Sequence, residues 1–152
     1  MPYFIIILIP FLDLTTKYFI RSYLQINQEI NLIPGFLNIN YKLNSGIAFS
    51  LFSNSAPLVH AITTKILPTL LIFFLIYLLK ISKETLEKKS LSLIIGGGIA
   101  NLIERFILGH VTDFIHIFYK SYHYPSFNLA DSFIVMGAFI LIYTQAKKSH
   151  KN

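Results

Sequence analysis

The segment that decides the fold is Gly-Gly-Gly-Ile-Ala-Asn-Leu-Ile-Glu-Arg, GGGIANLIER, at residues 96–105. Gly96 and Ala100 are four residues apart, so one face of a helix carries two small residues that allow another helix to approach closely. Asn101 and Arg105 share a second face at the same spacing. A charge inside an apolar helix costs roughly 2.5–3.5 kcal/mol at mid-bilayer, so such residues are functional candidates. The segment therefore predicts a closely packed helix that carries polar groups.

The composition indicates a membrane protein. The chain has 152 residues, about one domain, of which 54% are hydrophobic and 13% charged, and its mean hydropathy is +0.60. Four apolar segments approach or reach the length that crosses about 30 Å of hydrocarbon, although the last two are slightly short. We predict an all-α membrane protein, a four-transmembrane-helix bundle that forms a single integral membrane domain over residues 1–152, with spans near residues 2–20, 58–79, 91–108 and 127–143. The first is expected to be a permanent span, because it has no basic leader or A-x-A-like cleavage site.

The basic residues predict an orientation. The net charge of +6 does not indicate nucleic-acid binding, because the lysines and arginines are dispersed or flank apolar runs. Seven of them lie in the segment between the second and third spans and in the C-terminal tail. The other two connecting segments hold only three, which are Arg21, Lys42 and Lys120. The positive-inside rule then places both termini in the cytoplasm and residues 21–57 and 109–126 outside. Cysteine is absent from the sequence, which excludes disulfides, thiol catalysis and thiolate metal sites.

The first outer segment contains a predicted β-strand. Apolar and polar residues alternate from Leu37 to Asn44, a period of two that indicates one apolar face. Ser45 and Gly46 then continue a turn sequence. We expect a small β element on the extracytoplasmic side of the bundle, followed by residues suited to rest on the membrane surface, which are Phe49, Leu51 and Phe52.

The polar residues of the spans collect at one depth, near the predicted outer surface. Asp13 and Lys17 lie late in the first span and are four residues apart with the acid first, the favourable order for an ion pair. Asn128 and Asp131 share a face at the start of the fourth span. Asp113 lies just beyond the third span, and a short outer loop joins it to Asp131. We therefore expect the two carboxylates to meet at the outer interface.

Two adjacent carboxylates have a characteristic chemistry. They cannot both ionise easily, so the pKa of one rises and the pair shares one proton at intermediate pH. Such a dyad can activate water with one member and hydrogen-bond a peptide carbonyl with the other. No Ser-His or Ser-Lys arrangement competes well, and the five histidines show no metal-ligand spacing such as H-x-x-x-H. The pattern favours hydrolysis by dyad-activated water, with no metal.

Five motifs, in order along almost the whole chain, resemble those of lipoprotein signal peptidase, also called signal peptidase II, a family of bacterial membrane aspartic proteases. They resemble the family's D-x-x-x-K, N-x-G-x-A-F, G-N-x-x-D-R, V-x-D-F and F-N-x-A-D patterns, and lie at residues 13–17, 44–49, 97–105, 111–114 and 127–131. Each motif alone is weak, but five in order on four spans are specific. The chain departs from the patterns at Leu14, where glutamine is common, at Ala100, where glycine is usual, and at Glu104, where aspartate is usual.

The resemblance implies an aspartic endopeptidase that removes the signal peptide from diacylglyceryl-modified prolipoproteins, on the amino side of the lipidated cysteine. It implies no metal or organic cofactor, and a diacylated prolipoprotein and membrane lipid as partners. The site would lie near the outer face of the bacterial cytoplasmic (inner) membrane, and since one chain supplies it, we expect a monomer. The β element and the segment around Phe49 would form a cradle and lid. Asp113 and Asp131 would be the catalytic dyad, Asn44, Asn101, Arg105 and Asn128 would bind substrate or the aspartates, and Asp13 and Lys17 would support the site.

Other interpretations remain open on the sequence alone. Asp113 and Asp131 are also compatible with loop or helix-cap positions. The polar face of the third span suits interhelical contact and snorkelling, Lys65 suits snorkelling, and the acid–base pair of the first span suits a purely structural role. Two further functions are a small proton-coupled transporter, which predicts acidic groups near the bilayer midplane and internal repeats, and a non-catalytic assembly subunit, which tolerates the loss of either aspartate.

Overall fold

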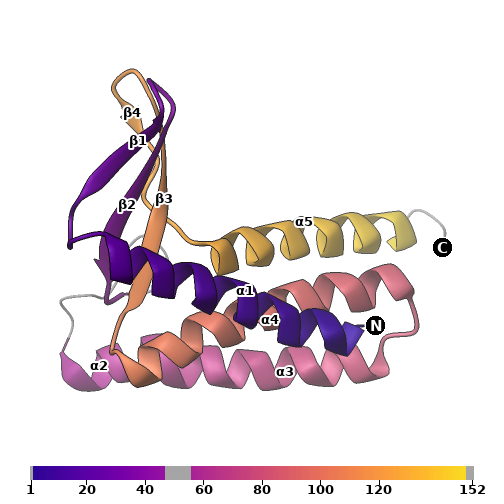
Figure 1. Ribbon diagram of the computed structural model, residues 1–152. Helices are drawn as coiled ribbons and strands as arrows, with labels where there is room; N and C mark the ends of the chain where they lie inside the picture. Colours follow the sequence, from indigo (N-terminus) through magenta and orange to yellow (C-terminus); the bar gives the residue numbers. More distant parts are fainter. Residues whose placement is uncertain (1, 47–55, 150–152) are drawn as a thin grey trace.

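The computed structural model describes residues 2–46 and 56–149. Four long helices form a bundle, and an antiparallel sheet stands at one end of it (Figure 1). Each helix is long and apolar enough to cross a membrane, in agreement with the prediction of four spans. The helices are α1 (Pro2–Tyr23), the continuous helix formed by α2 (Pro57–Ala61), the π-helical turn η2 (Ile62–Ile66) and α3 (Leu67–Ile81), then α4 (Thr85–Ile107) and α5 (Leu129–Ser149).

The third and fourth helices extend beyond the predicted apolar spans. Helix α4 begins at Thr85 rather than residue 91, and α5 runs from Leu129 to Ser149 rather than from 127 to 143. Both helices continue through polar residues at the same end of the bundle, where the Nζ of Lys148 lies 2.6 Å from a carboxylate oxygen of Glu87. An apolar run marks only the part of a helix that hydrocarbon must surround, so its ends do not mark the ends of the helix.

Helix α4 lies at the centre of the bundle. In its most apolar stretch 56% of the residues are buried within the protein, against 17–22% in the other three spans. Successive helical residues differ in direction by about 100°, so three consecutive glycines face three neighbours. A Cβ on Gly96 would lie 3.0 Å from Ile9 of α1, one on Gly97 would lie 2.5 Å from the backbone oxygen of Ala130 in α5, and Gly98 faces α3. The glycine run therefore packs three helices around one.

The sheet has the order β1-β2-β3-β4, with all neighbours antiparallel. The predicted strand from Leu37 to Asn44 is confirmed as β2, but residues 109–126 contain the strands β3 and β4 in place of the predicted loop. The start of β3 is buried on both faces, so its sequence shows no alternation of polar and apolar residues. In the register of β2 and β3, Asp113 lies opposite Lys42. The remaining bounds are β1 (Glu29–Ile33), β3 (Val111–Tyr119) and β4 (Tyr122–His123).

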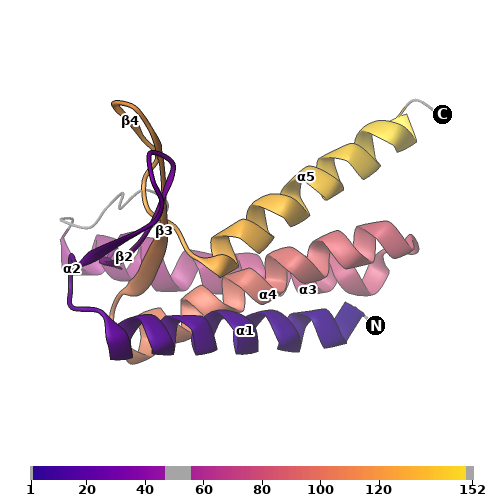
Figure 2. The same ribbon diagram turned by 45° about the horizontal axis from the view of Figure 1, so that its top comes forward.

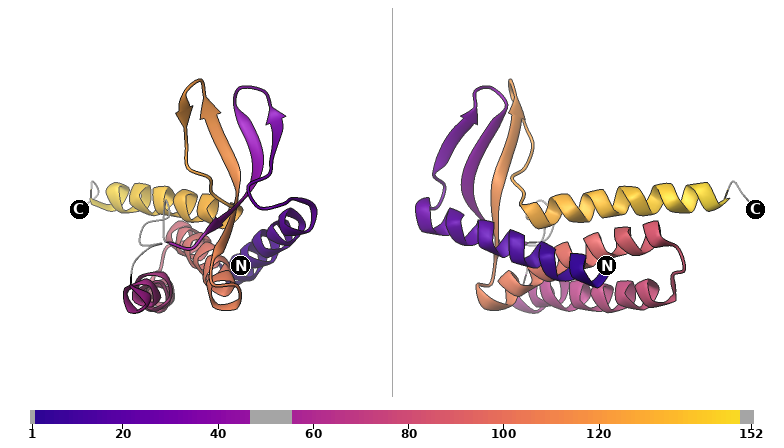
Figure 3. Two further views of the ribbon diagram at one scale, coloured as in Figure 1. Left: turned by 90° about the vertical axis from the view of Figure 1, so that its left-hand side faces the viewer. Right: turned by 45° about the vertical axis from the view of Figure 1, so that its right-hand side comes forward.

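The sheet and the two chain ends lie at opposite ends of the bundle. Strands β2 and β3 run across the helix axes and project to one side, while the start of α1, the turn between α3 and α4, and the end of α5 lie together at the far end (Figures 1 and 3). Helix α5 crosses α4 obliquely (Figure 2). Its first turn lies where the sheet meets the bundle, and this junction brings residues of α1, α4, α5 and β3 together.

The glycine run gives a direct test of this packing. Gly97→Ala should lower the free energy of unfolding by about 1–3 kcal/mol, because its methyl group would meet the backbone of α5 and force the helices apart. The matched control is Gly98→Ala, whose methyl would make ordinary contact at 3.4 Å with Ile72 and should stabilise the helix slightly. Thermal unfolding in detergent measures both, and equal melting temperatures for the two variants would contradict the packing described.

Candidate active site

Asp131 is fixed by the start of α5. It lies in the first turn, and Asn128 precedes the helix. The Oδ1 of Asn128 accepts a hydrogen bond from the backbone N of Asp131 at 2.9 Å, and the backbone N of Asn128 donates to the Oδ2 of Asp131 at 3.3 Å. This reciprocal pair is a capping box in which the aspartate plays the usual part of glutamate. Asp13 of α1 accepts from the backbone N of Ala130 at 2.8 Å. The carboxylate of Asp131 therefore sits at the positive end of a helix dipole.

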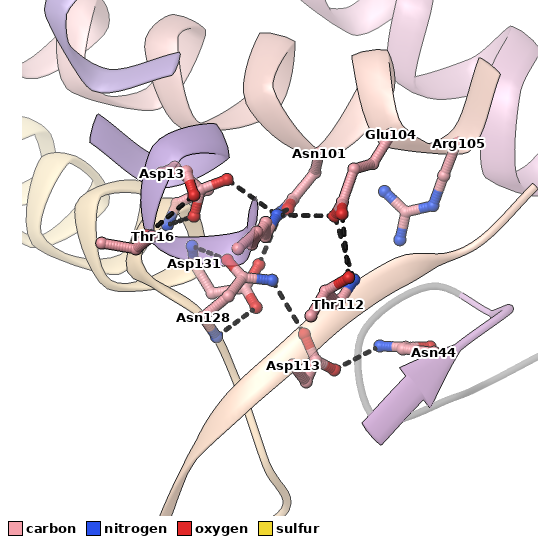
Figure 4. A network of polar contacts seen from close by, with 12 residues as sticks. Asp13, Thr16, Asn44, Asn101, Glu104, Arg105, Thr112, Asp113, Asn128 and Asp131 are labelled. Carbon is pink, nitrogen blue, oxygen red and sulfur yellow. Dashed lines mark hydrogen bonds and ion pairs between the residues drawn. The ribbon is translucent and has the colours of Figure 1, made fainter. Parts of the chain in front are cut away.

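Asp113 meets Asp131 through Asn128. The carboxylate of Asp113 is buried on β3, where Asn44 donates to its Oδ2 at 2.9 Å and Asn128 donates to its Oδ1 at 2.8 Å (Figure 4). Burial, and after it the charge of Asp131, raise the pKa of Asp113 to about 7, although the two amide hydrogen bonds lower it. One asparagine thus contacts both aspartates, and a strand rather than a loop presents Asp113.

Lys17 has no exposed surface and forms the centre of a buried polar cluster. Its Nζ lies 2.7 Å from Oδ2 of Asp13 and 3.0 Å from Oε2 of Glu104, and it donates to Oδ1 of Asn101 at 2.8 Å. An ammonium group can only donate hydrogen bonds, so Asn101 must turn its oxygen toward Lys17. The Nδ2 of Asn101 then donates to the Oδ1 of Asp131 at 2.8 Å. Lys17 therefore orients Asp131 through Asn101.

Glu104 connects the same cluster to Asp113. Its carboxylate accepts hydrogen bonds from the backbone N and the Oγ1 of Thr112, both at 2.9 Å, and it pairs with Arg21 as well as Lys17. Thr112 immediately precedes Asp113 on β3, so Glu104 fixes the strand next to the aspartate. Glu104 stands where the resembled pattern usually has aspartate. It keeps the negative charge and makes these contacts with a longer side chain.

Arg21 and Thr112 belong to the cluster but were not predicted as part of the site. Arg21 was interpreted only as a topology signal, although Asp13, Lys17 and Arg21 follow at intervals of four and share one face of α1. Thr112 gave no signal, because its role depends on the position of β3 beside α4. In contrast, all eight predicted site residues lie at or beside this junction.

Arg105 lies on the other side of the site. Its Nη2 donates to the backbone oxygen of Gly46 at 2.8 Å, and the backbone N of Gly46 donates to the Oδ1 of Asn44 at 3.1 Å. The predicted turn after β2 is thus present and is held against α4. The rest of the N-x-G-x-A-F motif, with the predicted membrane-surface and lid residues Phe49, Leu51 and Phe52, lies outside the described residues.

Known proteins share this architecture over nearly the whole chain. One solved structure, described as a bacterial membrane enzyme at 2.3 Å resolution, has a TM-score of 0.88 and 27% identity, covering 99% of this chain and 90% of its own. A second bacterial membrane enzyme, at 1.9 Å, has a TM-score of 0.79 and 28% identity, covering 95% and 91%. The fold is therefore that of a class of bacterial membrane enzymes.

Sequence comparison narrows the class. Residues 5–147 match the family described as signal peptidase (SPase) II. A lipoprotein signal peptidase of Francisella tularensis subsp. novicida is 40% identical over 145 residues, covering 92% of this chain and 88% of its own, and one of Blochmanniella pennsylvanica is 36% identical over 136 residues, covering 89% and 82%. The chain belongs to the signal peptidase II family, which is a family of proteases.

The buried cluster predicts a large effect on stability from one substitution. Lys17→Met should cost about 3–5 kcal/mol of unfolding free energy, because it leaves the carboxylates of Asp13 and Glu104 buried without their shared cation. Lys80→Met replaces an exposed helical lysine and is the matched control, with an expected change below about 0.5 kcal/mol. Chemical unfolding in detergent measures both, and a Lys17→Met protein as stable as the control would show that the cluster does not hold the helices together.

Proposed function

We propose that this protein is an aspartic endopeptidase that removes the signal peptide from diacylglyceryl-modified prolipoproteins, cleaving on the amino side of the lipidated cysteine. Membership of the signal peptidase II family and the names of the relatives support the substrate class. The observation that carries the reaction type is the joint contact of Asp113 and Asp131 with Asn128, together with a pKa of about 7 for Asp113. The donors of this site suit carboxylates and a peptide, so we propose chemistry without a metal or organic cofactor.

In the proposed mechanism the two aspartates have different roles. With its pKa near 7, Asp113 carries the shared proton at and below neutral pH and donates a hydrogen bond to the scissile carbonyl oxygen. Asp131 is only half-buried, so water can reach its carboxylate, which takes a proton from the water as the oxygen attacks the carbonyl carbon. When the tetrahedral intermediate collapses, that proton passes from Asp131 to the leaving amine of the lipidated cysteine.

The position of the aspartates supports a site at the outer membrane surface. They lie at the sheet end of the bundle. The end of α3, the turn after it, the start of α4 and the end of α5 carry six lysines and lie together at the opposite end (Figure 1). We infer that both termini face the cytoplasm and that the sheet lies outside, beside the lipid-anchored bond of the substrate. A proton-coupled transporter would instead need its acidic groups near the midplane. One chain supplies every contact described, which supports a monomer.

The first test removes each carboxylate in turn. Asp113→Asn and Asp131→Asn should each lower cleavage of a diacylated prolipoprotein by at least about a hundredfold, because amides neither hold the shared proton nor accept one from water. Glu84→Gln is the control, since this carboxylate is exposed at the far end of the bundle. Cleavage by purified protein in detergent is the measurement. Full activity in either aspartate variant would exclude the dyad and would favour the non-catalytic assembly subunit.

The second test is the dependence of cleavage on pH. The rate should fall as pH rises through about 7, because Asp113 then loses the proton that the dyad shares. Asn44→Ala removes a hydrogen bond that lowers the pKa of Asp113, so the falling limb should move to higher pH. Asn31→Ala, on the exposed strand β1, should leave the limb unchanged. A limb that moves to lower pH in Asn44→Ala would contradict the assignment of this pKa to Asp113.

A further inference from the structure

A groove runs along the surface of the bundle between α3 and α4. It consists of two adjoining parts of about 340 and 330 Å³, which share Thr69 and Phe106 in their lining. Lys65 lines the part nearer the sheet, and Ile72 and Ile99 line the deeper part. Apart from Lys65 and Thr69, the lining side chains are apolar. The groove therefore has one cationic end and a long apolar floor.

The groove is separate from the aspartate site. On α4 it is lined by one apolar stripe, which consists of Ile99, Leu102, Ile103, Phe106 and Ile107. Asn101 and Arg105 form another stripe, centred roughly 150° away around the helix axis at about 100° per residue. The groove and the aspartates thus use different faces of α4, and a ligand can occupy the groove without contacting either aspartate.

The dimensions of the groove suit one acyl chain. Its lining on the α2–η2–α3 helix extends from Ala61 to Phe73, which corresponds to roughly 18 Å at 1.5 Å per residue. One leaflet of a bilayer is about 15 Å deep, half of the hydrocarbon thickness. Because the groove runs along helices that are long and apolar enough to cross a membrane, the acyl chain of a lipid can lie in it lengthwise.

Lys65 supplies the charge at the upper end. Its Nζ lies 5.5 Å from the ring centroid of Phe106, and no carboxylate pairs with it within residues 2–46 and 56–149. An unpaired lysine within a span is costly, and an anionic group at the groove would reduce that cost. Lys65 also belongs to the π-helical turn η2. Such turns are rare in proteins, and those that occur are often found at functional sites. The ammonium group of Lys65 therefore has no acidic partner among the described residues and is available to bind a phosphate.

We propose that this groove binds one anionic phospholipid from the leaflet on the sheet side of the membrane. One acyl chain lies along Thr69, Ile72 and Ile99, and the phosphate contacts the ammonium of Lys65. The ligand is a membrane lipid with a net negative headgroup, and not the lipidated substrate, whose reactive bond must reach the aspartates on the other face of α4.

The test is native mass spectrometry of the detergent-purified protein with equal amounts of phosphatidylglycerol and phosphatidylcholine. The wild type should retain one lipid molecule and prefer phosphatidylglycerol to phosphatidylcholine by about fivefold. This preference corresponds to about 1 kcal/mol, the attraction of one lysine to an anionic headgroup. Lys65→Met should remove the preference, and Lys65→Arg should keep it. Lys120→Met is the matched control, because Lys120 also lies over an aromatic ring, 5.4 Å from the centroid of Tyr119, but away from the groove.

A second variant tests the place of binding. Ile103→Trp fills the groove and should reduce retention of both lipids, while prolipoprotein cleavage stays within about twofold of wild type, because Ile103 lies on the other face of α4 from the aspartates. Equal retention of the two lipids by the wild type, or the same loss of preference in Lys120→Met as in Lys65→Met, would overturn the proposal. Displacement of the bound lipid by a diacylated lipopeptide would also overturn it, by assigning the groove to the substrate. The lipid-retention results do not depend on the proposed protease mechanism, so a failure of that mechanism would leave them unchanged.

Discussion

The buried ammonium of Lys17 is the contact on which the rest of the site depends. It joins α1 to α4 through Asp13 and Glu104, and it fixes the direction of the Asn101 amide that holds Asp131. Glu104 in turn binds the strand that carries Asp113. In this cluster the positive charges of Lys17 and Arg21 balance the negative charges of the two carboxylates. Membrane helices thereby position two carboxylates that belong to a sheet and to the first turn of a helix.

This cluster requires helices that lie unusually close together. The glycine run of α4 allows α1, α3 and α5 to approach a single helix, and at Gly97 even a methyl group would meet the backbone of α5. Side chains of α1 can then reach the start of α5, where Asp13 caps the helix directly. Packing by small residues and a buried ion cluster are therefore two parts of one arrangement, because the short polar contacts exist only at this helix spacing.

The sequence predicted the elements that depend on local patterns. Four apolar runs gave the helices, alternation gave β2, and chain order with helical spacing gave Asp113, Asp131 and Asn128. Local patterns could not predict β3, since burial on both faces removes alternation, nor the polar ends of α4 and α5. Glu104 contacts both Arg21 and Thr112, and these contacts join elements that are far apart in the chain. Such contacts arise from tertiary packing, so the spacing of residues along the sequence indicates them only weakly.

The central claim is that the aspartate pair shares one proton near neutral pH, with Asp113 as its carrier. Infrared difference spectroscopy of the purified protein measures this directly, because a protonated carboxyl group has its own C=O stretch. The account predicts a carboxylic acid band that titrates with a midpoint of about 7, disappears in Asp113→Asn, and titrates at lower pH in Asp131→Asn, where the neighbouring charge is gone. A band that persists in Asp113→Asn, or no titration of any carboxyl group between about pH 6 and 8, would contradict it.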